Sequence, residues 1–201
     1  DKYKIAIIGS GPCGMSAGGR AAELGVPHIV LEKADHLSDT IFKFQKGKHV
    51  MATPDVLPLR SSMDFSIGIR EDILEKWSQQ TTELKVNIKY NSEVTEVIGE
   101  QGNYTLSLKN GDKINAENVV LGIGLQGNLR KVGVPGSDWE KVQYQLDDPD
   151  EYEAENIVVI GAGDAAIENA VALSKQNNVY IVNRRGEFAR AKDGNIKLIE
   201  N

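Results

Sequence analysis

The chain has 201 residues, of which 40% are hydrophobic and 26% charged, and its net charge is −6 at neutral pH. These proportions exclude global disorder, and the acidic balance excludes a general basic surface for nucleic acid. No apolar run approaches the ~20 residues that span a membrane, and the first residues enter a strand at once, which leaves no room for a signal peptide. The single cysteine, Cys13, excludes an intrachain disulfide, a CxxC pair and a cysteine zinc cluster. We therefore expect a cytoplasmic protein with no metal site, no nucleic-acid partner and no membrane segment.

The first 32 residues have the pattern of one parallel crossover unit. Residues 2–9 predict a buried strand, residues 11–24 a helix and residues 28–31 a second short strand. Pro12 suits the first helical turn, and Gly25 suits the position just past the helix end. Strand, glycine turn, helix and strand in this order predict a βαβ unit.

The middle of the chain predicts an antiparallel meander. Residues 33–68 are expected to form a loop with short pieces of strand or helix, and the apolar spacing that follows predicts a helix over 70–82. Asn110–Gly111 is a strong signal for a tight turn between two of the strands that come next. The last strand of the series is expected to be buried. The expected strands cover residues 85–90, 93–100, 104–109, 113–116 and 118–123.

The pattern of strand, glycine turn, helix and strand then recurs after an acidic segment. Residues 137–156 contain eight carboxylates and one lysine, a net charge of 1 − 8 = −7. We favour a solvated linker there, with an electrostatic docking site for a basic partner as the alternative. The second series predicts a strand over 155–160, a glycine turn at 161–163, a helix over 165–175 and a strand over 179–183.

The first glycine turn carries the pattern of a dinucleotide-binding loop, Gly9-Ser10-Gly11-Pro12-Cys13-Gly14. The first glycine permits the tight turn, the second lets the backbone approach a pyrophosphate, and the third lets the helix pack against the strand. The phosphates would lie at the helix N-terminus. Glu32 follows the second strand, 18 residues after Gly14, where a carboxylate can accept hydrogen bonds from the hydroxyls of an adenosine ribose. The alternative is a glycine-rich turn with a purely structural role.

The second glycine turn carries the variant Gly161-Ala162-Gly163-Asp164-Ala165-Ala166, with alanine in the last position. Its second strand ends in Asn183, Arg184 and Arg185, with Arg190 beyond, and no acid stands where Glu32 stands in the first unit. Guanidinium groups match phosphate oxygens, so this strand end predicts NADPH rather than NADH. The alternative is a solvated strand end. Two dinucleotide units in one chain point to hydride transfer from a nicotinamide to a flavin.

These motifs resemble those of the two-dinucleotide flavoproteins close to thioredoxin reductase, and the resemblance covers about residues 3 to 192. It implies an FAD site at the first glycine loop and Glu32, and an NADPH site at the second loop and the arginines. Residues 116–124 resemble the second FAD motif of the family, with Gly122 in place of its usual alanine. Arg190 stands one place later than the corresponding family arginine. The cofactor-binding residues that the resemblance implies are Gly9, Gly11, Pro12, Cys13, Gly14, Glu32, Lys33, Gly122 and Gly124 for FAD, and Gly161, Gly163, Asp164, Ala165, Ala166, Glu168, Asn183, Arg184, Arg185 and Arg190 for NADPH.

The sequence therefore predicts an α/β fold with two Rossmann-like three-layer dinucleotide-binding units and an inserted antiparallel β-meander. The expected domains are an FAD-binding domain over residues 1–124, an acidic linker over 125–154 and a partial NADPH-binding domain over 155–201. The chain stops at Asn201, before the segment with which the family returns to its FAD domain, so we expect a piece of a longer flavoprotein. The family is often dimeric, which implies a possible homodimer.

The electron acceptor is left open between two classes. The chain lacks the CxxC pair of thioredoxin reductases, which excludes dithiol exchange by that route. The run Gly-Pro-Cys-Gly is similar to that of bacillithiol disulfide reductase-like flavoproteins, which implies that Cys13 reduces a small disulfide; a helix N-terminus favours the thiolate form. The alternative for Cys13 is a small residue that fills a tight helix–strand contact. A ferredoxin-like or other protein acceptor is the second option, and a non-catalytic dinucleotide-binding module of a larger redox assembly is the competing class.

Overall fold

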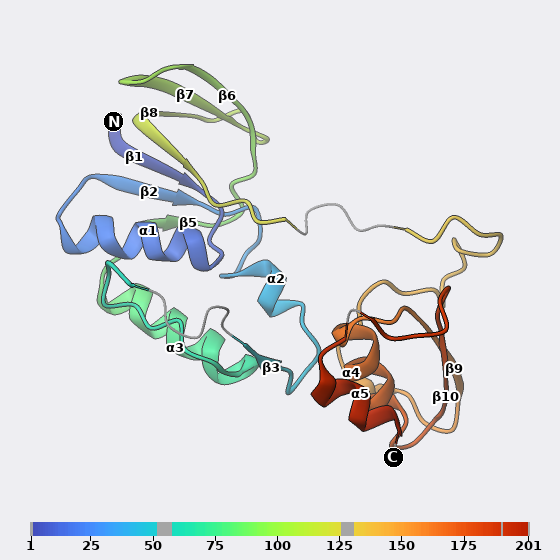
Figure 1. Cartoon of the computed structure of the whole chain (residues 1–201). Helices are drawn as coiled ribbons and strands as arrows, with labels where there is room; N and C mark the ends of the chain where they lie inside the picture. The colour runs from blue at the N-terminus through green and yellow to red at the C-terminus, as the bar shows by residue number, and fades with distance from the viewer. Residues whose placement is uncertain (1, 52–57, 126–130, 190, 201) are drawn as a thin grey trace. The chain divides into compact units, whose positions relative to one another are not determined.

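The computed structural model describes residues 2–51, 58–125, 131–189 and 191–200. It divides into two compact units, residues 1–139 and residues 140–201 (Figure 1). The division falls inside the segment expected to be a linker, so residues 125–139 belong to the first unit and residues 140–154 to the second. Within the described residues, no helix is long and apolar enough to cross a membrane.

The first unit begins with the crossover that the sequence predicts. Strand β1 (Lys2–Ile8) leads through helix α1 (Pro12–Glu23) to strand β2 (His28–Leu31), and β1 pairs with β2 in parallel. The helix starts at Pro12 because proline needs no hydrogen-bond partner for its nitrogen at that position. Gly25 follows the helix end with a φ of +64°, a conformation that glycine adopts without strain. The predicted βαβ unit is confirmed.

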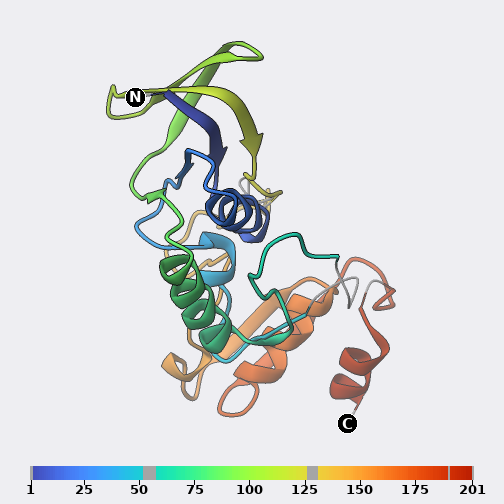
Figure 2. The same cartoon turned by 90° about the vertical axis from the view of Figure 1, so that its left-hand side faces the viewer.

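The two faces of these parallel strands pack against different layers, because successive side chains of a strand point to opposite faces. Ile7 and Val30 face α1, where their methyl groups lie against Gly14 and Gly18. Figure 1 shows α1 along this face and α3 beyond it, and Figure 2 shows the same order from the side. The opposite face carries a buried cluster that joins β1 and β2 to later strands. Its members are Ala6, Ile29, Leu31, Leu106, Leu108 and Ala116.

The described residues between 33 and 68, which are 33–51 and 58–68, are mostly irregular, as expected, and lead into the predicted helix. This part of the chain contains the one-turn helix α2 (Asp39–Phe42) and the two-residue strands β3 (His49–Val50) and β4 (Gly68–Ile69), which pair antiparallel. Helix α3 (Arg70–Glu83) follows. These elements bury a second apolar cluster with α1, made of Met15, Leu37, Ile41, Met63, Ile73 and Trp77. The cluster fixes α2 and α3 close to the start of α1.

The predicted meander is partly wrong. Of the strands expected in the meander, β6 (Val94–Glu100), β7 (Asn103–Leu108) and the start of β8 (Lys113–Leu121) pair antiparallel. The run expected to open the meander is instead the short strand β5 (Ile88–Lys89), which pairs in parallel with β2. The sheet order is β5-β2-β1-β8-β7-β6. The predicted tight turn at Asn110–Gly111 is confirmed, since Gly111 has a φ of +93° and joins β7 to β8.

The two last expected strands of the first unit are one strand, β8. Its residues up to Ala116 pair with β7, whereas its second half pairs with β1 alone. The second half was expected to be buried, and this is wrong: Asn118 and Leu121 are exposed, and Val119 and Val120 are half-buried. The reason is that β7 has already turned away at this point, so one side of β8 has no neighbouring strand.

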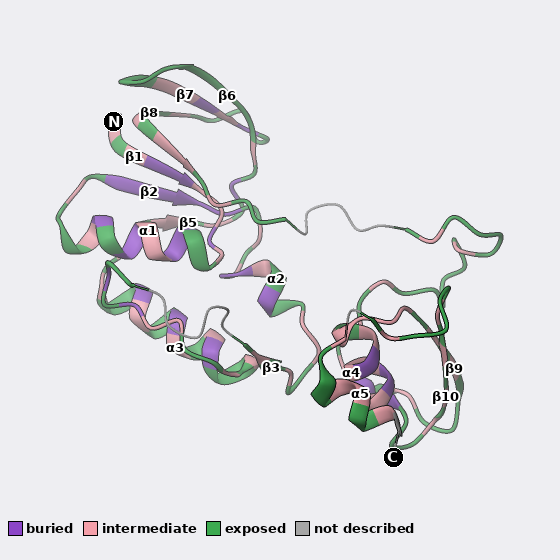
Figure 3. Cartoon of the chain, viewed as in Figure 1, coloured by how far each residue is buried: buried purple, intermediate pink, exposed green. Residues whose placement is uncertain are grey.

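The second unit repeats the crossover. Strand β9 (Asn156–Ile160), helix α4 (Asp164–Leu173) and strand β10 (Asn178–Val182) form a parallel pair with the helix on one face. Ile167, Ala170 and Leu173 of α4 are buried, as the purple turns of this helix show (Figure 3). A one-turn helix, η1 (Pro149–Glu151), precedes the crossover, and a helix that the sequence did not predict, α5 (Asp193–Glu200), follows it.

Candidate functional site

In the first unit, the ends of several parallel strands bring the predicted glycines together. Because β1, β2, β5 and β8 are parallel, their carboxyl ends share one edge of the sheet, which is where ligands bind in open α/β sheets. Gly9 follows β1 with a φ of +96°, and its N–H donates to Leu31 at 2.8 Å. A Cβ at Gly9 would lie 2.5 Å from the carbonyl oxygen of Gly122. Gly9 is thus required by both the turn and the close approach of the two chain segments.

The other two glycines of the first loop differ sharply in their surroundings. A Cβ at Gly14 would lie only 1.8 Å from the carbonyl oxygen of Gly9, whereas a Cβ at Gly11 would meet nothing within 4 Å. Gly11 is the N-cap of α1, and no side chain caps this helix. The first turn of a helix has N–H groups without intrahelical partners. Gly14 is therefore closely packed against the end of β1, whereas Gly11 has open space at the uncapped N-terminus of α1.

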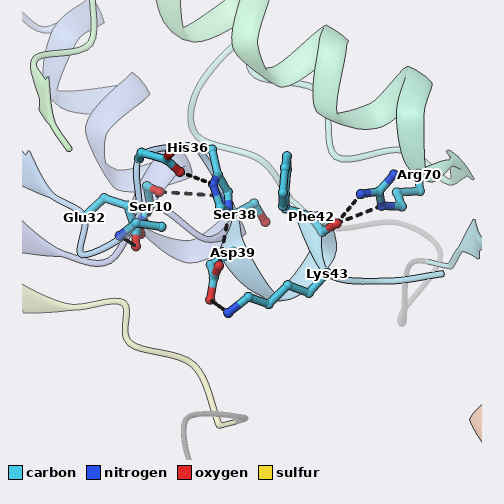
Figure 4. A network of polar contacts seen from close by, with 10 residues as sticks. Ser10, Glu32, His36, Ser38, Asp39, Phe42, Lys43 and Arg70 are labelled. Atoms are coloured by element: carbon cyan, nitrogen blue, oxygen red, sulfur yellow. Dashed lines mark hydrogen bonds and ion pairs between the residues drawn. The ribbon is translucent and has the colours of Figure 1, made fainter. Parts of the chain in front are cut away.

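Glu32 is held firmly beside this loop, as the close-up shows (Figure 4). Its Oε2 accepts hydrogen bonds from both the N–H and the hydroxyl of Ser10, each at 2.8 Å, and its Oε1 accepts one from the N–H of Ala34 at 2.9 Å. A carboxylate can accept about four hydrogen bonds, so the side chain keeps capacity for one more. Glu32 is 5% exposed. Burial raises the pKa of Tyr90, and the nearby Glu32 carboxylate adds to the rise.

A polar network ties helix α2 to the same loop (Figure 4). The N–H of Ser38 lies 3.2 Å from the carbonyl oxygen of Ser10 and 3.3 Å from its hydroxyl. His36 lies between two carboxylates, with Nδ1 2.6 Å from Asp35 and Nε2 3.1 Å from Asp39. Burial acts to raise the pKa of Asp39, but the hydrogen bonds and charges of Lys43 and His36 outweigh it and hold the pKa below its ordinary value.

A ring contact and a hydrogen bond complete this network. The ring of His36 stacks on that of Phe42 with centroids 3.7 Å apart, and Nε of Arg70, at the start of α3, donates to the carbonyl oxygen of Phe42 at 3.0 Å. The network therefore joins the glycine loop to the start of α3 through α2. The sequence did not indicate a role for Ser38 or His36. Of these residues, only Ser10 could be associated with the site beforehand, because it lies inside the glycine motif.

The remaining predicted residues of the first unit lie at the surface of this edge. Pro12 and Cys13 open α1 and are exposed, and Lys33 is exposed beside Glu32. Gly122 has little room, because a Cβ there would lie 3.2 Å from the nitrogen of Gly14. Gly124 has a φ of +65° with open space around it. The predicted set for the first loop thus gathers at one edge of the sheet.

In the second unit, the glycine loop has the same arrangement. Gly161 has a φ of +147°, and its N–H donates to the carbonyl oxygen of Val182 at 3.0 Å, so the loop begins level with the end of β10. A Cβ at Gly161 would lie 3.2 Å from that of Ala166, whereas a Cβ at Gly163 would meet nothing within 4 Å. Gly163 is the N-cap of α4, again without a side-chain cap. Ala165 is exposed in the first turn.

The charged residues predicted for the second site have divided roles. Arg184 and Arg185 are exposed just beyond β10, and Asn183 donates to the carbonyl oxygen of Glu187 at 2.7 Å, which closes the turn that carries them. Asp164 and Glu168 instead accept hydrogen bonds from the segment that starts α5. Arg190 lies outside the described residues. Within those residues, no group of three or more His, Cys, Asp or Glu side chains is arranged to hold a metal ion.

Comparison with known proteins identifies the family. The family model described as pyridine nucleotide-disulphide oxidoreductase matches residues 6–199, almost the whole chain. The chain belongs to this family. The family assignment confirms the expected kinship with the FAD- and NAD(P)H-dependent reductases.

Several members of this oxidoreductase family are similar to the chain. A ferredoxin–NADP reductase of Ignicoccus hospitalis is 24% identical over 183 residues, which are 90% of the chain and 56% of that protein. A ferredoxin–NADP reductase of Picrophilus torridus is 27% identical over 198 residues, which are 96% of the chain and 57% of that protein. The chain thus spans little more than half the length of these curated relatives.

Solved structures of the oxidoreductase family confirm the fold class. Bacillithiol disulfide reductase Bdr from Staphylococcus aureus superposes with a TM-score of 0.86 at 21% identity, over 100% of this chain and 63% of that one. Thioredoxin reductase from Lactococcus lactis gives a TM-score of 0.73 at 21% identity, over 97% of this chain and 60% of that one. Both likenesses concern the fold, and they confirm the predicted α/β architecture with Rossmann-like units.

Proposed function

We propose that the chain is the dinucleotide-binding part of an oxidoreductase that uses NADPH to reduce FAD. The observation that carries the proposal is the pair of uncapped helices, α1 and α4, each preceded by a glycine with open space at its Cβ position. A buried carboxylate accompanies the first loop, and two exposed arginines accompany the second. This difference at otherwise equivalent loops supports a different dinucleotide for each.

The first unit has the features that an FAD adenylate requires. The open side of Gly11 and the N–H groups of the first turn of α1 suit a pyrophosphate, because the helix N-terminus carries partial positive charge. Glu32 keeps capacity to accept a hydrogen bond from a ribose hydroxyl, and Ser10 holds that carboxylate in place. The cofactor-binding roles of Pro12, Cys13, Lys33, Gly122 and Gly124 are part of the same proposal.

The second unit has the features that NADPH requires. Gly161, Gly163 and Ala166 would hold the pyrophosphate at the N-terminus of α4, and Arg184 and Arg185 would bind the 2′-phosphate. Guanidinium groups pair strongly with phosphate oxygens, and Asn183 shapes the turn that presents them. Since the residue after β10 is not an acid, no carboxylate opposes a phosphate at that position.

A bound flavin supplies the redox chemistry, since it accepts hydride from a reduced nicotinamide and passes electrons to an acceptor. This chain contributes binding and orientation: the glycine loops hold the phosphates, and Glu32 and the arginines orient the adenosine ends. The acceptor is proposed to be a small disulfide or an electron-carrier protein. The names of the similar proteins, ferredoxin–NADP reductase and bacillithiol disulfide reductase, support both classes.

The FAD assignment is tested by the visible absorption spectrum of the purified chain after incubation with FAD and desalting. We expect wild-type protein to keep flavin bands and Glu32→Gln to lower FAD affinity by about tenfold or more, because hydrogen bonds to charged groups contribute roughly 1.5–3 kcal/mol. The matched control is Glu93→Gln, which removes an exposed carboxylate of the same unit that pairs with Lys109. Circular dichroism melts of each variant separate lost binding from lost folding.

The outcomes of this experiment are distinct. Equal FAD affinity in wild type and Glu32→Gln would contradict the ribose assignment. A folded wild-type chain that stays colourless with added FAD would contradict FAD binding by the first unit, and would favour a non-catalytic module that binds another nucleotide.

Cys13 decides between the two acceptor classes. It is exposed in the first turn of α1, where a small disulfide could reach it. If the acceptor is a small disulfide, the flavin-loaded protein with NADPH is expected to reduce it, and Cys13→Ser is expected to abolish that reduction while the rate of flavin reduction by NADPH is kept. Unchanged disulfide reduction in Cys13→Ser would exclude the thiol route. Absence of disulfide reduction by the flavin-loaded wild-type protein would favour a protein acceptor.

A further inference from the structure

Asp164 occupies an unexpected place for an acidic residue. It is the first residue of α4, directly after the glycine loop that is proposed to hold the NADPH pyrophosphate. A carboxylate that faced this loop would repel the phosphates. The structure shows that the carboxylate is engaged elsewhere: its Oδ1 accepts hydrogen bonds from the N–H of Lys192 at 2.8 Å and from Nδ2 of Asn195 at 2.9 Å.

The partners of Asp164 belong to the start of helix α5. The carbonyl oxygen of Lys192 accepts the N–H of Ile196 at 3.1 Å, so Lys192 is the residue directly before the first residue of α5 and accepts its first hydrogen bond. Asn195 also donates to Oε1 of Glu168 at 3.2 Å, one turn further along α4. The negative charge of Asp164 is therefore set against the N-terminus of α5, where the helix dipole stabilises it.

This contact fixes one end of the segment that carries the arginines. We name residues 183–189 together with residues 191 and 192 the arginine loop. Its beginning is joined to the glycine loop, because Gly161 donates to the residue before it, Val182, at 3.0 Å. Its end is joined to the same glycine loop through Asp164 and Lys192. Residues 161–164 thus hold the arginine loop at both ends. The glycine loop and the arginine loop, which are the two halves of the proposed NADPH site, are therefore fixed to each other.

We propose that Asp164 is a positioning residue for nucleotide selectivity: it holds the arginine loop at the distance from the α4 N-terminus at which Arg184 and Arg185 reach a 2′-phosphate. The inference rests on the proposed NADPH site. Asp164 itself contacts the arginine loop rather than the nucleotide. A dinucleotide without a 2′-phosphate makes no use of the arginines, so its binding is insensitive to where the loop lies.

The test compares NADPH and NADH binding to the whole chain by fluorescence titration. Asp164→Ala removes the acceptor of both hydrogen bonds and is expected to raise the Kd for NADPH by about tenfold, with the Kd for NADH changed less than about threefold. Asp164→Asn keeps an oxygen acceptor at the same place and is expected to restore the NADPH preference. Asp193→Asn removes an exposed charge from the first turn of α5 and is expected to leave both constants unchanged.

Amide hydrogen exchange gives a second readout that does not depend on nucleotide. In Asp164→Ala, the amides of Ala191 and Lys192, which donate to Phe188 and Asp164 in wild type, are expected to exchange at least about tenfold faster, while those in the second half of α4 keep their rates. Asp164→Asn is expected to exchange like wild type. Unchanged exchange of these two amides in Asp164→Ala would overturn the positioning role.

Two outcomes distinguish failure of the positioning role of Asp164 from failure of the proposed NADPH site. If Asp164→Ala weakens NADPH and NADH by the same factor, the residue supports α4 in general, and the selectivity role is overturned while the NADPH site stands. If wild-type protein binds NADPH no better than NADH, the proposed NADPH site and the inference both fail.

Discussion

Replacement of Gly14 by alanine is expected to destabilise the first unit by about 3 kcal/mol or more. The new methyl carbon would lie 1.8 Å from the carbonyl oxygen of Gly9 and 3.4 Å from a methyl group of Ile7. Since the first obstacle is backbone, no side-chain rotation relieves it, and α1 has to move away from β1. Overpacking of a well-filled interior costs about 1–3 kcal/mol even where side chains adjust. Urea unfolding of wild type and variant measures the difference.

Gly11→Ala is the matched control for this experiment. Its Cβ would point into open space, with no atom within 4 Å, and Gly11 has an ordinary φ of −68°. We expect a stability change below about 1 kcal/mol, because only the N-cap preference of glycine over alanine is lost. FAD affinity is nevertheless expected to fall about tenfold or more, since the methyl group occupies the space proposed for the pyrophosphate. Loss of stability to the same extent in both variants would contradict the packing argument.

Arg184→Ala is expected to weaken NADPH binding by about tenfold to a hundredfold and to leave NADH binding nearly unchanged. The reason is that charge-assisted hydrogen bonds contribute roughly 1.5–3 kcal/mol each, and only NADPH carries the 2′-phosphate. The side chain is exposed just beyond β10, so its removal leaves no cavity and should not affect folding. Fluorescence titration with both nucleotides measures the effect.

Two variants sharpen the interpretation of this result. Arg184→Lys keeps the charge but loses the planar fork, and an intermediate loss of NADPH affinity is expected. Arg20→Ala removes an exposed arginine of the first unit and should change neither constant. Equal losses for NADPH and NADH in Arg184→Ala would refute the assignment of Arg184 to the 2′-phosphate.

The sequence predicted those parts of the fold that depend on local patterns. Both crossovers are visible in it because strand-forming residues, a glycine turn and a helix-forming run follow one another within about thirty residues. Strand pairing is not local, and this is why β5 was assigned to the meander although it pairs with β2. For the same reason β8 was divided in two, since nothing near residue 117 shows that its neighbour changes from β7 to β1.

The candidate site shows the same limit. The glycines and Glu32 could be found from their spacing, because one backbone geometry demands them. Asp164 was placed with the nucleotide because it lies in the motif, and only the three-dimensional contact with Lys192 gives it another partner. Helix α5 was missed, since its eight residues are too few to show a clear apolar period.

The parallel strand pairs of the two units have the same register where the glycine loops begin. Ile8 is level with Leu31 in the first pair, and Ile160 is level with Val182 in the second. The first residue after the second strand therefore takes the equivalent position in each unit: Glu32 in the first unit and Asn183 in the second. Under the proposed assignment, this position carries an acid that suits a free diol in the first unit and an uncharged amide that leaves the neighbouring arginines to a phosphate in the second. The same backbone geometry would then serve two nucleotides, with the residue at this register position contributing to the choice between them.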